Sequence, residues 1–116
     1  MAVKGIRGAI TIKSNTVADI REAVVELLGQ MLKQNNIEIK NISHVIFTMT
    51  KDLNAAFPAK FARTELGFTE TAMMCFNEID VPGALKKCMR ILIVLNCKDD
   101  FVPQFVYLKG AETLRN

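Results

Sequence analysis

A charged side chain stands inside the most apolar stretch of the sequence. The segment "CMRILIVLN", residues 88–96, is a run of mostly aliphatic side chains interrupted near its start by Arg90. Arginine is almost never fully buried without a partner, and an unpaired buried charge costs several kcal/mol. Arg90 therefore either pairs with an acidic side chain of the protein or receives an anion from outside.

Several further side chains that could bind or polarise a ligand lie on or beside predicted β structure or a short predicted helix. Arg7 lies between two glycines in "GIRGA" (5–9), and Glu78 is one of few carboxylates flanked by apolar residues. The full set beside Arg90 consists of Arg7, Lys60, Arg63, Cys75, Glu78 and Tyr107. Together with Arg90, these residues describe a small pocket with excess positive charge, one acid and one phenol, which suits a dianion.

Each of these residues also has an ordinary structural interpretation. Arg90 could form an internal salt bridge with Glu78 or Asp80, and Arg7 could be a solvated strand residue. Tyr107 could fill part of the core with its hydroxyl at the rim. The two cations of "PAKFAR" share one helix face and could simply be solvated. The residue types alone leave these alternatives open.

The sequence lacks the motifs of covalent, metal-dependent or hydride-transferring enzymes. It contains no G-x-S-x-G, no phosphate-binding loop, no Rossmann glycine pattern and no His/Cys/Asp cluster with metal spacing. The three cysteines, Cys75, Cys88 and Cys97, are odd in number and show no paired spacing, so we expect buried free thiols. We expect neither a metal nor a cofactor.

Length and composition set the broad class. A chain of 116 residues with 50% hydrophobic and 23% charged residues predicts a single globular domain over residues 1–116. No apolar stretch approaches the roughly 20 residues of a membrane span. The N-terminal segment is interrupted by Lys4, Arg7 and Lys13 and lacks the apolar core of a signal peptide, so we expect a cytoplasmic protein without a membrane partner.

The elements that must position these side chains follow from the hydrophobic pattern. A helical stripe over 17–34 follows Thr16, which with Asp19 resembles a capping box. A shorter helix begins at Pro58 and ends at Gly67. We expect strands over residues 3–12, 43–50, 70–76, 87–96 and 105–111. This is an α/β arrangement, with one long and one short helix on a mixed sheet. Two helices leave one sheet face uncovered, and a subunit interface is its natural cover.

Four stretches of the sequence resemble the AroH class of chorismate mutase. They are "GIRGA" (5–9), "FPAK" (57–60) with Arg63, "CFNEIDVPGALKKCMR" (75–90) and "VYLKGA" (106–111). They occur in the same order and at nearly the same spacings, and the resemblance covers essentially the whole chain. It implies a homotrimeric pseudo-α/β barrel with active sites between adjacent subunits. The implied reaction is the cofactor-free Claisen rearrangement of chorismate to prephenate, on the route to phenylalanine and tyrosine.

The resemblance also implies roles for the matched residues. Arg90 would contact the ether oxygen and a carboxylate of chorismate, while Arg7 and Tyr107 would hold carboxylate oxygens. Glu78 would accept from the substrate hydroxyl and help to orient the cations, with Cys75 near the same hydroxyl. Phe57 would form an apolar wall that comes from the neighbouring subunit. Lys60 and Arg63 would lie at the entrance as steering charges.

The sequence departs from this family pattern at four places. Met73 and Met74 replace smaller or polar residues, and the turn "VPGA" (81–84) contains Pro82. The loop "CKDDFVPQ" (97–104) is one residue short, so the match of Tyr107 rests on "VYL". The tail ends soon after Leu114 and Arg115, and we expect an abbreviated cover over the site there.

Two other interpretations compete with this one. A trimeric module of the YjgF/RidA type, acting on imines or binding metabolites, would also use an arginine between subunits. It gives no reason for Glu78, the pair Lys86 and Lys87, and Arg90 occurring together. A nucleic-acid-binding domain using Lys60 and Arg63 with Phe61 is disfavoured by a net charge of only +3, so we expect no nucleic-acid partner.

Overall fold

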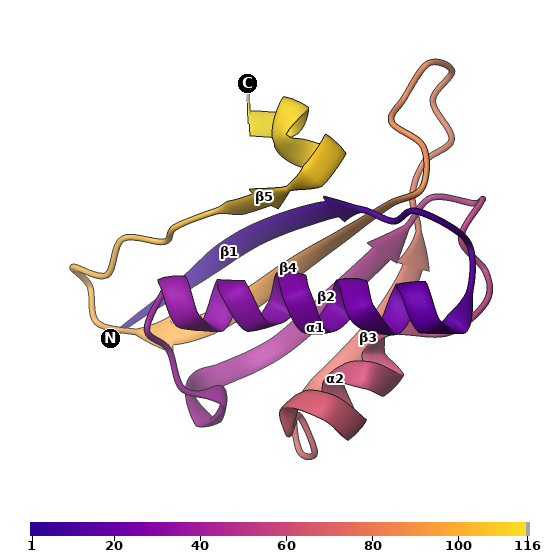
Figure 1. Cartoon of the computed structure of the whole chain (residues 1–116). Helices are drawn as coiled ribbons and strands as arrows, with labels where there is room; N and C mark the ends of the chain where they lie inside the picture. Colours follow the sequence, from indigo (N-terminus) through magenta and orange to yellow (C-terminus); the bar gives the residue numbers. More distant parts are fainter. Residues whose placement is uncertain (116) are drawn as a thin grey trace.

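The computed structural model describes residues 1–115, except for the side chain of Arg115 (Figure 1). The helices are α1 (Val17–Gln34) and α2 (Pro58–Leu66), with short 3-10 helices η1 (Ile39–Asn41) and η2 (Lys109–Arg115). The strands are β1 (Ala2–Thr11), β2 (Ile42–Met49), β3 (Ala72–Asn77), β4 (Cys88–Cys97) and β5 (Val106–Leu108). No helix of the described residues is long and apolar enough to cross a membrane.

The five strands form one mixed sheet in the order β3-β2-β4-β1-β5. Strand β4 lies at the centre and runs antiparallel to both of its neighbours, β1 and β2. The outer pairs, β1 with β5 and β2 with β3, are parallel. The predicted fold class, two helices on a mixed sheet, is confirmed.

Helix α1 has the bounds that the sequence predicts, because its start is fixed by a side-chain cap. The Thr16 hydroxyl accepts a hydrogen bond from the Asp19 backbone N–H at 3.1 Å. The expected capping box is only half formed, since the Asp19 carboxylate accepts from the Ser14 hydroxyl instead of reaching back to Thr16.

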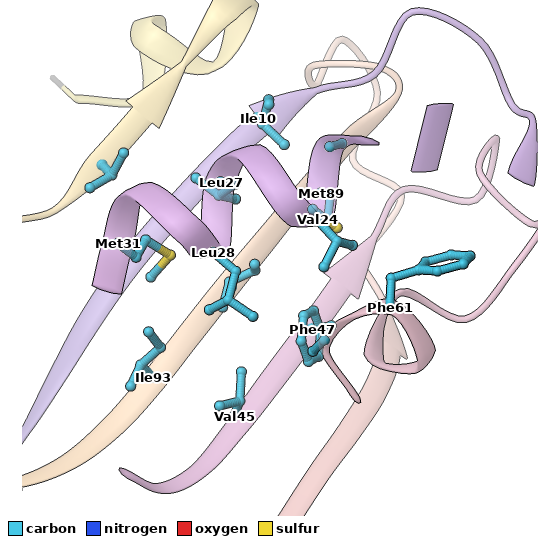
Figure 2. Close-up of a cluster of buried hydrophobic side chains, with 14 of the residues drawn as sticks. Ile10, Val24, Leu27, Leu28, Met31, Val45, Phe47, Phe61, Met89 and Ile93 are labelled. Carbon is cyan, nitrogen blue, oxygen red and sulfur yellow. The ribbon is translucent and has the colours of Figure 1, made fainter. Parts of the chain in front are cut away.

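The buried core lies between the helices and one face of the sheet. Figure 2 shows the α1 stripe of Val24, Leu27, Leu28 and Met31 directed at the strands, and all four side chains are fully buried. Their partners on the sheet include Ile10, Val45, Phe47, Met89 and Ile93.

Gly8 allows α1 to pack closely against β1. A Cβ at this position would overlap the Met31 sulfur and lie 3.2 Å from Leu27 Cδ1. The glycine of "GIRGA" therefore has a packing role, and it keeps the helix close to the strand that carries Arg7.

The opposite sheet face carries the alternate residues of each strand, because successive side chains of a strand point to opposite faces. Neither main helix lies on this side (Figure 1). A small buried cluster of Ala9, Cys88 and Ala111 covers part of it near β5 and η2. We call the whole surface the open face; the single chain described here leaves most of it uncovered, as the helix count predicts.

The segment before β5 is tied to the end of α1 by Asn35, a buried polar residue. Its side-chain amide donates to the carbonyl oxygens of Met31 (2.8 Å) and Gln104 (3.0 Å), and its oxygen accepts from the Gln104 N–H at 2.7 Å. Since Gln104 lies two residues before β5, this contact holds the segment that leads into β5 against the end of α1.

Three sequence expectations need correction here. The last strand is shorter than the predicted 105–111, because Lys109 adopts a left-handed φ of 54° and the chain turns into η2. Strand β3 begins at Ala72 and not at residue 70. All three cysteines are free, but only Cys88 is buried, while Cys75 and Cys97 are half-buried.

Candidate active site

Three of the predicted site residues, Arg7, Arg90 and Tyr107, come from the open face. In the register of the sheet, Ala9 of β1 lies opposite both Arg90 of β4 and Tyr107 of β5. On its other side, Arg90 lies opposite Thr48 of β2. Arg7 lies two residues before Ala9 and so points to the same side of the sheet. The small Ala9 separates the arginine from the tyrosine in this row.

A cavity of about 230 Å³ opens at this row of side chains. It brings together both arginines of the open face with the acid that the sequence singled out. Its lining consists of Arg7, Gly8, Ile46, Thr48, Glu78, Arg90, Ile91 and Leu92. Of the expected pocket, two cations and the acid line this cavity, whereas Tyr107, Lys60 and Arg63 are not part of its lining.

Arg90 has an internal carboxylate close by, but that carboxylate does not satisfy it fully. Its Nε lies 3.4 Å from Glu78 Oε2, close enough for ionic attraction. The same Nε is buried and has no hydrogen-bond partner among residues 1–115, so the approach lacks hydrogen-bond geometry. The other proposed partner, Asp80, pairs instead with Lys51 at 2.8 Å. The internal carboxylate thus leaves a donor of Arg90 unsatisfied, next to a cavity.

Glu78 is anchored to the end of β2 by two hydrogen bonds. Its backbone N–H donates to the Met49 carbonyl oxygen at 2.9 Å. The Thr48 hydroxyl donates to Oε2, the same carboxylate oxygen that approaches Arg90. The Glu78 side chain is 24% exposed and the Arg90 side chain 38% exposed, so both can be reached from the open face.

The start of β4 is clamped two residues before Arg90. The Asp52 carboxylate accepts from the Lys87 N–H at 3.0 and 3.2 Å, and the Thr50 hydroxyl accepts from the Cys88 N–H at 3.1 Å. This clamp holds Lys87 in a left-handed conformation with φ 48°. Burial raises the pKa of Asp52, but hydrogen bonds from Thr50 and Lys87 outweigh it and leave that pKa below its ordinary value.

Tyr107 and Cys88 lie at the β5 side of the row. Tyr107 is half-buried and packs against the cluster of Ala9, Cys88 and Ala111, with Leu114 beside it. Burial raises the pKa of the Cys88 thiol, although nearby Arg90 acts in the opposite direction. Cys88 is therefore an uncharged packing residue. Leu114 packs against this cluster, and the side chain of Arg115 lies outside the described part of the chain.

The remaining predicted residues lie apart from Arg90 in the single chain. Phe57, 74% exposed, and Cys75 line a second cavity of about 390 Å³ between β3 and the segment leading into α2. The Cys75 side chain is on the helix side of β3, and burial raises its pKa. Lys60 and Arg63 are exposed on α2.

A third cavity, of about 420 Å³, lies along the loop that joins β3 to β4 and projects from the end of the sheet (Figure 1). Glu78 lines it as well as the cavity beside Arg90, so the two spaces meet at this carboxylate. Pro82, one of the departures from the family pattern, lies in this loop and away from Arg90.

Sequence reasoning missed Thr48 and Asp52. Thr48 alternates with the buried Phe47 and Met49, and that alternation was a signal that it faces the same side as Arg90. Asp52 stands in an irregular connection and left no comparable signal. Among the described residues, no group of three or more His, Cys, Asp or Glu side chains could hold a metal ion.

Comparisons with known proteins agree with this geometry. The family model described as chorismate mutase type I matches residues 3–116. A Thermus thermophilus protein named chorismate mutase AroH is 41% identical, over 97% of this chain and 93% of its own length. Its Bacillus subtilis counterpart is 34% identical, over 99% and 91%. The solved chorismate mutase from Clostridium thermocellum is 48% identical, with a TM-score of 0.90, over 95% of this chain and 98% of that one. These findings give no support to the YjgF/RidA alternative.

Proposed function

This chain belongs to the chorismate mutase type I family, and we propose that it rearranges chorismate to prephenate with Arg90 as the central catalytic residue. The reaction is pericyclic: the ether C–O bond breaks as a C–C bond forms, and neither a proton transfer nor a covalent intermediate is required. A site built from fixed charges, without a nucleophile–base pair, is sufficient for this chemistry.

One observation carries the proposal for Arg90: its Nε is buried without a hydrogen-bond partner beside an open cavity. Cleavage of the C–O bond runs ahead of C–C formation and leaves negative charge on the ether oxygen. A guanidinium already in place interacts more strongly with that charge than with the neutral ether, so it lowers the barrier. Its planar fork can hold a carboxylate of the substrate at the same time.

The other residues of the open face would hold the dianion in its reactive shape. We propose that Arg7 and Tyr107 bind carboxylate oxygens, since both share the face of Arg90. Glu78 would accept from the substrate hydroxyl. Fixing a compact, chair-like conformer lowers the activation free energy, because the entropy cost of bringing the reacting carbons together is met on binding.

We further propose that residues 1–116 form one domain that assembles as a homotrimer, with the open face at the interface. Exposed apolar side chains support this, since Met74 is 61% and Phe76 46% exposed on the open face of β3. A neighbouring subunit would bring Phe57 as an apolar wall, with Lys60 and Arg63 at the entrance, and Cys75 would lie near the substrate hydroxyl. Light scattering coupled to gel filtration tests the assembly. A cytoplasmic location stays a prediction.

The activity is tested by incubating the purified protein with chorismate. Prephenate is measured by its conversion to phenylpyruvate in acid, and EDTA is added in a parallel reaction. We expect prephenate to form at the same rate with and without EDTA. Prephenate no faster than in buffer alone would refute the proposed function, and a rate lost on EDTA treatment would refute a mechanism based on fixed side-chain charges alone.

A further inference from the structure

We propose that Thr48 is a positioning residue of this site, whose hydroxyl holds the Glu78 carboxylate in the orientation that serves the substrate. This inference rests on the proposed function, in which Glu78 accepts from the substrate hydroxyl. It gives a role to a side chain that the sequence did not single out.

The sheet places Thr48 where it can act on both charged groups. Thr48 lies directly opposite Arg90 in the β2–β4 register. The side chains of Thr48, Glu78 and Arg90 line the same cavity. Its neighbours along β2, Phe47 and Met49, are buried on the helix side, so the hydroxyl is directed to the open face.

The two oxygens of the Glu78 carboxylate differ in their contacts. The Thr48 hydroxyl donates to Oε2, and Arg90 Nε approaches the same Oε2 at 3.4 Å. Both contacts fall on one oxygen, which leaves Oε1 to accept from a substrate hydroxyl. A hydrogen bond to a charged acceptor is shorter and stronger than one between neutral groups.

The ion pair alone would not fix this orientation. Arg90 Nε lacks hydrogen-bond geometry toward Oε2, and the Glu78 side chain is 24% exposed, so water could turn the carboxylate. The backbone bond from the Glu78 N–H to the Met49 carbonyl oxygen anchors the residue but not its side chain. The Thr48 hydroxyl supplies the missing directional contact.

The test compares Thr48→Val, Thr48→Ala and Thr48→Ser, alone and combined with Glu78→Ala, by steady-state kinetics with chorismate. Valine keeps the branched shape and favours a strand, so it removes the hydroxyl and little else. Serine restores the hydroxyl. Ser43→Ala removes a hydroxyl from the exposed start of β2 and is the matched control. Thermal melts of every variant report folding.

We expect Thr48→Val and Thr48→Ala to lower kcat about tenfold to a hundredfold, the range of a hydrogen bond to a charged group. KM should change less, because the cations that bind the dianion remain. Thr48→Ser and Ser43→Ala should stay within about threefold of the unmodified protein. In the Glu78→Ala background, Thr48→Val should change kcat less than about twofold, since Thr48 then has nothing to position.

Three results would overturn the inference: an unchanged kcat in Thr48→Val, a serine variant as impaired as the valine variant, or an equal loss in the Glu78→Ala background. The last would show that Thr48 acts through the strand and not through the carboxylate. If Thr48→Val does not fold, Thr48→Ala takes its place in the same cycle. An unmodified protein without activity would refute the proposed function itself, which separates the two failures.

Discussion

Replacing Arg90 by alanine is the most direct test of how this site would work. The substitution removes the guanidinium from the cavity and leaves its neighbours in place. If Arg90 stabilises the charge that develops on the ether oxygen, kcat/KM should collapse while the protein remains folded. The two effects can be estimated separately from the surroundings of the side chain.

The catalytic effect has two parts. Removing a donor from a developing oxyanion costs about 3–4 kcal/mol in comparable sites. Losing a charge-assisted hydrogen bond to a substrate carboxylate costs about 1.5–3 kcal/mol more. Since each 1.4 kcal/mol is tenfold, kcat/KM should fall by about three to five orders of magnitude.

The effect on folding should be much smaller. The Arg90 side chain is 38% exposed, and its contact with Glu78 is an ion pair without hydrogen-bond geometry. Such pairs contribute at most about 1 kcal/mol. Glu78 also keeps its hydrogen bond from Thr48 after the arginine is gone. The free energy of unfolding should therefore change by about 1 kcal/mol or less.

The assay measures prephenate formation and urea unfolding on the same preparations. Arg21→Ala is the matched control, because Arg21 is an exposed arginine of α1 on the other side of the sheet. Arg90→Lys should recover part of the activity, since it restores charge without the planar fork. An Arg90→Ala protein that is folded and retains kcat within tenfold would refute the reasoning.

Two further predictions concern the framework of the site. Gly8→Ala should lower the free energy of unfolding by about 1–3 kcal/mol in urea titrations, because its Cβ would overlap the Met31 sulfur. Gly29→Ala, with open space around its Cβ, should instead raise it by up to about 1 kcal/mol, and the reverse order would contradict the packing described. Asp52→Ala should destabilise the protein at neutral pH by releasing the Lys87 N–H. Because the pKa of Asp52 is lowered on folding, its contribution is present above the unfolded value near 3.8 and is lost as the pH falls through the folded value. The unfolding difference between Asp52→Ala and the unmodified protein should therefore shrink below pH 3.8, and a constant difference would argue against the carboxylate.

The elements were predictable where local signals agree with one another. Thr16 precedes a stripe of apolar residues at helical spacing, so both the start and the buried face of α1 could be predicted. Strand β4 was equally clear from its apolar run. The end of β5 could not be predicted, because the left-handed conformation falls on Lys109, a residue type that rarely adopts it, and not on the neighbouring Gly110.

The site was predictable in its residue types but not in its arrangement. Arg7, Glu78 and Arg90 were identified from their apolar surroundings and from the family resemblance, and the structure brings them to one cavity. Which carboxylate approaches Arg90 depends on the path of the β3–β4 loop, and the sequence left Glu78 and Asp80 open. The part played by Thr48 depends on its pairing with Arg90 across β2 and β4, and the sequence reasoning assigned no partners to these strands.

The alternation of side chains along β4 also affects the stability of mispaired forms of the sheet. Arg90 reaches the cavity because Met89 and Ile91, on either side of it, enter the core. A slip of one residue between β4 and its neighbours would drive the guanidinium into the hydrocarbon interior and expose two apolar side chains. A chain mispaired by one residue would therefore be much less stable than the native one, and the same alternation that builds the core also directs the cation to the cavity.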